Sequence, residues 1–149
     1  FDWDAATGTL RWDDEQLALH GLARERFGGS RESWLALVHP EDRAAADAAV
    51  SHSLRTGVFS AEFRIVRADD GTVRWLEARG RVLHDADGAP VRMLGINVDV
   101  TERRRIQAQL RESAAFSRAV ADAAPGILYI YDVQTRRNVW GNREMSALL

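Results

Sequence analysis

Residues 95–105 constrain the fold of this chain most, because an apolar strand pattern there passes into a charged helical pattern without an intervening loop. Apolar residues alternate with others along the strand, at Leu94, Ile96, Val98 and Val100, which predicts one buried face. Thr101 can then cap a helix whose first turn carries Glu102. We therefore expect a strand that runs straight into a helix and is rigidly coupled to it.

Two more strand patterns precede this junction. Alternation runs through residues 58–66 and 72–84 before the last strand at 91–100, and Asp-Gly turn sequences separate the three. On the middle strand, small and apolar residues share one face, and Trp75, Glu77, Arg79 and Arg81 share the other. We expect an antiparallel sheet covered on one side, with a core face formed by Leu76, Ala78, Val82, Ile96 and Val98.

The first part of the chain predicts a hairpin and three helices. Aromatic-rich segments at 1–4 and 9–12 flank a turn that contains Gly8. Short apolar helices are expected after Asp13 and from residue 30 to 39. Pro40 suits the first position of a longer helix that ends at Thr56 and Gly57.

Residues 101–124 contain no glycine or proline and predict a long linker helix. A heptad frame places one seam on this helix, formed by Ile106, Leu110, Ser113, Ser117, Val120 and Ala124. The seam is apolar at its ends and polar in the middle. It fits a solvated connecting helix and a dimeric coiled coil equally well.

The end of the chain repeats its beginning. Asp4, Thr7 and Trp12 recur 128 positions later as Asp132, Thr135 and Trp140. We interpret residues 125–149 as the start of a second copy of the first domain. The predicted organisation is a domain at 1–100, a helical linker at 101–124 and this fragment at 125–149.

Composition and motifs exclude several function classes. A 149-residue chain that is 46% hydrophobic can bury a core, and its net charge of -2 predicts no attraction to nucleic acid. Without cysteine it has no disulfide or thiolate chemistry, and no apolar run is long enough for direct membrane insertion. No phosphate loop, nucleophile elbow or metal-binding helix pair is present, so we predict no enzyme activity and no metal site.

Several short motifs together resemble the PAS sensor domains of bacterial signalling proteins. They are Leu37-Val38-His39-Pro40-Glu41-Asp42-Arg43, Glu62-Phe63-Arg64, Asp70-Gly71, Arg74-Trp75 and Asp99-Val100-Thr101-Glu102-Arg103. The resemblance covers residues 1–103 and implies an α+β fold, a PAS-like five-stranded antiparallel sheet with helices packed on one face, followed by the long linker helix. A weaker resemblance at 127–149 implies a tandem PAS arrangement.

The resemblance implies a noncatalytic sensory and interaction module of a multidomain signal-transduction protein. A conformational signal would pass through the junction residues Asp99, Val100, Thr101, Glu102 and Arg103 to a downstream PAS and output domain, such as the histidine kinase of a two-component system or a diguanylate cyclase. Two alternatives stay open: a sensor that binds a small molecule or cofactor, and a structural dimerisation spacer. We expect a cytoplasmic homodimer, whether or not the full-length protein is membrane-anchored, with contacts at Trp75, Met93, Ile106 and Leu110.

No cofactor is predicted. Flavin photosensors of this family use a cysteine, which the chain lacks, and haem-binding members need a histidine on the longer helix. His52 lies on that helix but only five residues before Gly57, where a solvated or capping histidine is the simpler interpretation. A small-molecule ligand remains compatible with the sequence.

Overall fold

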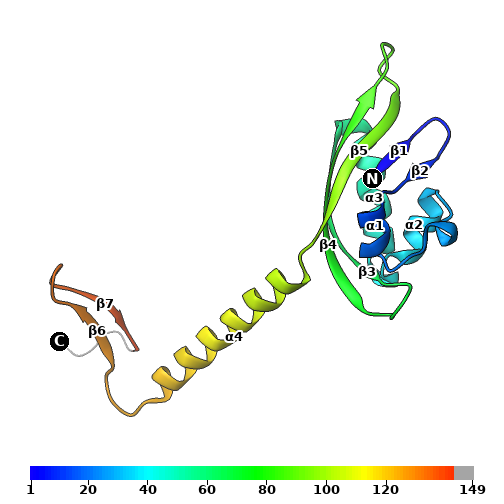
Figure 1. Cartoon of the computed structure of the whole chain (residues 1–149). Coiled ribbons are helices and arrows are strands. Elements are labelled where there is room, and N and C mark those ends of the chain that lie inside the picture. The colour runs from blue at the N-terminus through cyan, green and yellow to red at the C-terminus, as the bar shows by residue number, and fades with distance from the viewer. Residues whose placement is uncertain (143–149) are drawn as a thin grey trace. The chain divides into compact units, whose positions relative to one another are not determined.

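The computed structural model describes residues 1–142 and divides the chain into two compact units, Phe1–Glu102 and Arg103 onwards. Figure 1 shows the order of the helices and strands. Their bounds are β1 (Asp2–Asp4), β2 (Leu10–Arg11), α1 (Asp14–Leu19), η1 (Arg24–Arg26), α2 (Arg31–Leu37), η2 (Pro40–Asp42), α3 (Arg43–Thr56), β3 (Val58–Val66), β4 (Val73–His84), β5 (Pro90–Asp99), α4 (Thr101–Ala123), β6 (Tyr129–Asp132) and β7 (Arg137–Gly141).

The first unit is built on a five-stranded antiparallel sheet in the order β2-β1-β5-β4-β3. Helices α1, α2 and α3 cover one face of this sheet (Figure 1). The long helix α4 begins two residues after β5 ends, without a loop. The predicted fold class, with its strand-to-helix junction and linker helix, is confirmed.

Local capping explains where the covering helices begin and end. The Asp13 carboxylate accepts the Gln16 N–H at the start of α1, and Ser30 and Ser33 form a reciprocal capping box at the start of α2. Helix α3 ends at Gly57, whose φ of 79° is a left-handed conformation that glycine adopts without strain.

The core face of β5 differs from the prediction. Leu76, Ala78 and Val82 on β4 are buried as expected, but Ile96 is 62% exposed and Val98 is 48% exposed. The register explains the difference, because residues opposite one another in an antiparallel pair share a face. Val82 pairs with Met93, whereas the exposed Arg79 pairs with Ile96. The alternating residues Leu94, Ile96 and Val98 therefore lie on the outer face, and Met93 is in the core.

The second unit contains α4 from Arg103 onwards and the hairpin β6–β7. The turn between β6 and β7 is held by the same kind of hydrogen bonds as the turn between β1 and β2. The Asp132 carboxylate accepts the backbone N–H groups of Gln134 and Thr135, as the Asp4 carboxylate accepts those of Ala6 and Thr7. That residues 125–149 begin a second copy of the domain stays a prediction.

Candidate functional site

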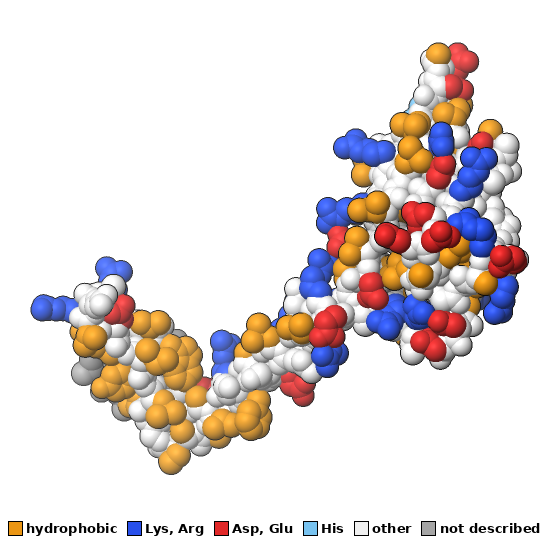
Figure 2. Space-filling model, viewed as in Figure 1, with side chains coloured by type: hydrophobic (Ala, Val, Ile, Leu, Met, Phe, Trp, Pro, Cys, Tyr) orange, Lys and Arg blue, Asp and Glu red, His pale blue; other side chains and the backbone are white. Residues whose placement is uncertain are grey.

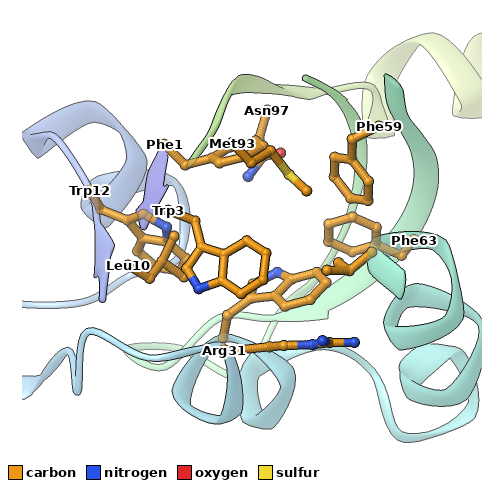
Figure 3. Close-up of a pocket in the computed structure, with 11 residues that line it drawn as sticks. Phe1, Trp3, Leu10, Trp12, Arg31, Phe59, Phe63, Met93 and Asn97 are labelled. Carbon is orange, nitrogen blue, oxygen red and sulfur yellow. The ribbon is translucent and has the colours of Figure 1, made fainter. Parts of the chain in front are cut away.

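A cavity lies inside the first unit, between the sheet and the helices (Figure 3). The cavity volume is about 40 Å³, and the larger empty space of about 440 Å³ around it includes open solvent. Six of its eleven lining residues are aromatic; the complete set is Phe1, Trp3, Leu10, Trp12, Arg31, Trp34, Val50, Phe59, Phe63, Met93 and Asn97. This lining is apolar with a few polar groups, as is usual for sites that hold small molecules.

Polar atoms without partners line this cavity. Among residues 1–142, five buried side-chain nitrogen or oxygen atoms have no hydrogen-bond partner within the protein. Three of them belong to lining residues: Trp3 Nε1, Arg31 Nε and Asn97 Oδ1. A buried polar atom left unpaired costs roughly 1–3 kcal/mol, so these three atoms are the groups around this space with free capacity to bind water or a ligand.

Phe1, which lines the cavity, is in close contact with Gly95 on β5. The N-terminal amine of Phe1 donates to the Gly95 carbonyl at 2.7 Å, and the Gly95 N–H donates back to the Phe1 carbonyl at 3.0 Å. A Cβ on Gly95 would lie within 3.0 Å of the Phe1 ring and of the Arg79 carbonyl. Glycine is therefore required at position 95 for the Phe1 ring to lie against β5.

The strand-to-helix junction is held by hydrogen bonds to β4. The Val100 N–H donates to the Trp75 carbonyl at 2.8 Å, and the Trp75 N–H donates to Thr101 Oγ1, also at 2.8 Å. The Asp99 carboxylate accepts the Thr101 N–H and lies 3.5 Å from the Arg74 guanidinium. Val100 is buried, so both the backbone and a side chain fix the start of α4 to the sheet.

Arg64 extends this network to the helical layer. Its guanidinium donates to both carboxylate oxygens of Asp42 and to Glu41, and it lies 5.5 Å from the ring centre of Trp75. The hydrogen bonds from Arg64 hold the pKa of Asp42 at about 2, and Asp42 in turn raises the pKa of Arg64. A continuous run of contacts therefore joins η2 through Arg64 and Trp75 to the start of α4. We call it the junction network.

Sequence reasoning named these network residues only as separate motifs. Acids at a helix start are favourable charges for the helix dipole, and the structure also pairs both Glu41 and Asp42 with Arg64. The other junction residues, Glu102 and Arg103, are exposed and lie on either side of the boundary between the two units.

The predicted dimer contacts fall in different environments. Met93 is 2% exposed and lines the cavity, so its assignment to an outer contact surface is wrong. Trp75 is half-buried beneath Arg64, whereas Ile106 and Leu110 are 54% and 70% exposed on α4. Figure 2 shows hydrophobic side chains at the surface of this helix.

Two polar residues of the interior were missed. Asn97 was not considered, although an asparagine within an apolar strand pattern is unusual and could have been noticed. His20 received no role from the sequence, yet it is fully buried and packs against the Trp12 ring, with a centroid distance of 4.2 Å. Burial lowers the pKa of His20 to about 4. His52, in contrast, is exposed near the end of α3.

Comparison with protein families matches residues 9–97 to the model described as "PAS fold". Among curated proteins, 133 residues are 26% identical to the sensor protein FixL of Bradyrhizobium diazoefficiens, covering 89% of this chain and 26% of that protein. Over 103 residues, the chain is also 31% identical to the two-component sensor PprA of Pseudomonas aeruginosa, covering 67% of this chain and 11% of PprA. The chain thus spans about a quarter or less of these relatives.

Among solved structures, a sensory box histidine kinase/response regulator from Burkholderia thailandensis superimposes with a TM-score of 0.65. It is 29% identical, and the match covers 79% of this chain and 88% of that one. The N-terminal domain of a diguanylate cyclase with a PAS/PAC sensor from Marinobacter aquaeolei has the same fold, with a TM-score of 0.63 at 21% identity, covering 69% of this chain and 94% of that one. None of the helices in residues 1–142 has the length and apolar content needed to cross a bilayer.

Proposed function

The chain belongs to the PAS fold family, and we propose that it is a noncatalytic sensory and interaction module of a multidomain bacterial signalling protein. A molecule in the aromatic cavity would alter the junction network, and α4 would carry the change to a downstream domain of the same polypeptide. The reaction itself would belong to an output domain outside these 149 residues, such as a histidine kinase or a diguanylate cyclase. Similarity to segments of sensor proteins supports this role.

The observation that carries this proposal is that one strand serves both the cavity and the junction network. Strand β3 places Phe63 in the cavity wall, and the next residue, Arg64, contacts Asp42 and Trp75. Successive side chains of a strand point to opposite faces, so pressure on Phe63 displaces the backbone that carries Arg64. A ligand that contacts Phe63 differently in two states of the domain would thereby bias the position of α4.

The proposed partner is a second copy of the chain. Four large apolar residues of α4 are at least 54% exposed: Ile106, Leu110, Phe116 and Val120. The helix of a second copy would cover three of them through the predicted heptad seam. Leu94, Ile96 and Val98 on the outer face of β5 offer further apolar area for the same homodimer.

The proposal assigns no haem or flavin and a cytoplasmic location. Lack of cysteine and the exposure of His52 support the first point. The cavity residues offer aromatic surfaces and amide or indole groups, which suit an organic ligand. A visible absorption spectrum of purified protein tests this directly, and a Soret or flavin band that His52→Ala removes would contradict it.

The proposed transmission from the cavity through the junction network to α4 is called the relay, and hydrogen exchange of Arg64→Gln tests it. Loss of the Asp42–Arg64 pair should loosen Trp75 and speed exchange of the Val100 amide, which donates to the Trp75 carbonyl, by roughly tenfold. Arg79→Gln is the matched control, because Arg79 is exposed on the outer face and pairs with Glu77. Arg64→Gln can also speed exchange simply by lowering the free energy of global unfolding. If the Val100 amide exchanges faster only by the amount that this global loss explains, the relay does not exist.

Sedimentation velocity tests the dimer. The chain should sediment as a dimer at high micromolar concentration, and Leu110→Glu should dissociate it, since a charge in a helix seam opposes association. Glu112→Gln on the same helix is the control. A wild-type chain that remains monomeric at this concentration would remove the proposed homodimer but leave the cavity and the relay untouched.

A further inference from the structure

We propose that the cavity selects a small, uncharged aromatic molecule that accepts a hydrogen bond at one edge and donates one at another. A phenol that also carries a ketone is an example of this class. The inference rests on the proposed function, because it names the kind of ligand that the sensory cavity would hold. It is argued from the shape, the polar atoms and the charge balance of the cavity.

The walls favour a flat ring. Figure 3 shows the Trp3 ring on one side of the space, with Phe59 and Phe63 along another. Phe59 also meets the Phe1 ring edge to face at a centroid distance of 6.1 Å, and Phe63 meets the Trp34 ring in the same way at 5.6 Å. Aromatic side chains prefer offset-stacked or edge-to-face partners, so a planar ring gains contacts that a branched aliphatic molecule does not.

The unpaired polar atoms define the polar edges of the ligand. The Trp3 indole nitrogen can only donate, so it requires an acceptor on the ligand. Asn97 Oδ1 can only accept, so it requires an O–H or N–H group. Trp3 comes from β1 and Asn97 from β5, and Figure 3 shows them entering the space from different sides. The acceptor and the donor therefore belong at different edges of one ring.

The charge balance favours a neutral molecule. Among the lining residues within residues 1–142, Arg31 carries the only charged side chain. Its guanidinium lies 2.6 Å from the Asp47 carboxylate and also donates to Ser51, and Nε is its buried nitrogen without a partner. Since Asp47 already compensates the cation, a carboxylate ligand would lose its hydration among aromatic rings without gaining a free positive charge.

Four matched compounds test this class by calorimetric titration of the whole chain. 4-Hydroxyacetophenone has both groups, 4-methoxyacetophenone lacks the donor, 4-ethylphenol lacks the carbonyl acceptor, and 4-hydroxybenzoate is charged. We expect 4-hydroxyacetophenone to bind roughly tenfold more tightly than the methoxy compound and 4-ethylphenol, the ratio that one missing buried hydrogen bond produces. It should also bind more tightly than the benzoate, whose charge loses its hydration in the cavity.

Two variants then assign each preference to its residue. Asn97→Leu should remove the preference for the hydroxyl over the methoxy compound, and Trp3→Phe should remove the preference for the ketone over 4-ethylphenol. Asn138→Leu and Trp140→Phe make the same substitutions on β7, outside the cavity, and should preserve both ratios. Because each ratio is measured within one protein, a general loss of stability does not imitate the result.

Equal binding of all four compounds, tighter binding of the benzoate, or no binding of any at millimolar concentration would overturn the proposal. The proposal would also be overturned if Asn97→Leu and Trp3→Phe kept the wild-type ratios of affinity between the compounds. The relay is judged separately, by hydrogen exchange at Val100 with and without 4-hydroxyacetophenone. Selective binding that leaves this exchange unchanged would refute the proposed transmission and preserve the ligand class.

Discussion

Substitution of Gly95 by alanine is expected to be among the most damaging single-methyl changes in the first unit. The added Cβ would lie within 3.0 Å of two groups, the Phe1 ring and the Arg79 carbonyl oxygen. The ring can rotate away, but the carbonyl belongs to β4, which is paired with β5 at Gly80 and Gly95. Relief of the second clash therefore requires the two strands to separate locally.

The expected cost is about 3 kcal/mol in the free energy of unfolding. Overpacking of a well-packed site costs typically ~1–3 kcal/mol. The upper end applies here because the clash involves backbone and because the paired bonds between Phe1 and Gly95 would be strained as well. In a domain of this size each kcal/mol shifts the midpoint of thermal unfolding by roughly 4–8 °C, so the shift should exceed about 10 °C.

Urea denaturation followed by circular dichroism measures this loss, and Gly126→Ala is its matched control. Nothing lies within 4 Å of a Cβ at Gly126 and its φ is not positive, so that variant should keep wild-type stability. A double variant Phe1→Ala/Gly95→Ala should recover the part of the loss that the ring causes. If Gly95→Ala costs less than about 1 kcal/mol, the close strand pairing described here is wrong.

Three further outcomes follow from the same structure. In urea denaturation, Met93→Ala should cost about 2–5 kcal/mol and Ile96→Ala no more than about 0.5 kcal/mol, because only Met93 is buried. The reverse order would mean that Ile96 lies on the core face of β5, as the sequence pattern predicted. Thr101→Val should cost about 1 kcal/mol and speed exchange of the Trp75 amide, since it removes the acceptor of that N–H, whereas Thr101→Ser should behave as wild type. The pKa values of His20 and Asp42 are lower in the folded state than in the unfolded chain, so stability should fall as the pH is lowered through two ranges. The ranges are from pH ~6.5 to about 4 for His20 and from pH ~4 to about 2 for Asp42. Urea midpoints measured over a pH series should become flat in the first range for His20→Phe and in the second for Asp42→Asn.

Sequence alone determined the elements of this protein and their order. The three alternating strands, the turns between them and the helix without glycine or proline are local patterns, set by side-chain period and turn chemistry. The junction at residues 95–105 was visible for the same reason, because it is one uninterrupted segment. The motif resemblance then supplied the fold that the comparisons bear out.

Tertiary structure decided which face of β5 enters the core. Either of the two alternating sets of side chains on this strand could have faced the core. The pattern favoured Leu94, Ile96 and Val98, because they are more apolar than the other set, which contains Met93 and Asn97. A shift of one residue in register exchanges the two faces, and only the pairing of Val82 with Met93 fixes it.

The cavity and the junction network also depended on contacts between distant segments. Trp3 and Asn97 are 94 positions apart in the sequence, and Asp42 precedes Arg64 by 22. No local pattern can indicate that an indole N–H and an amide oxygen are left unpaired around one space, because that depends on every neighbour that could have satisfied them. The sequence therefore specified a strand that leads directly into a helix, and the packed sheet determined which residues line the cavity and which hold the helix.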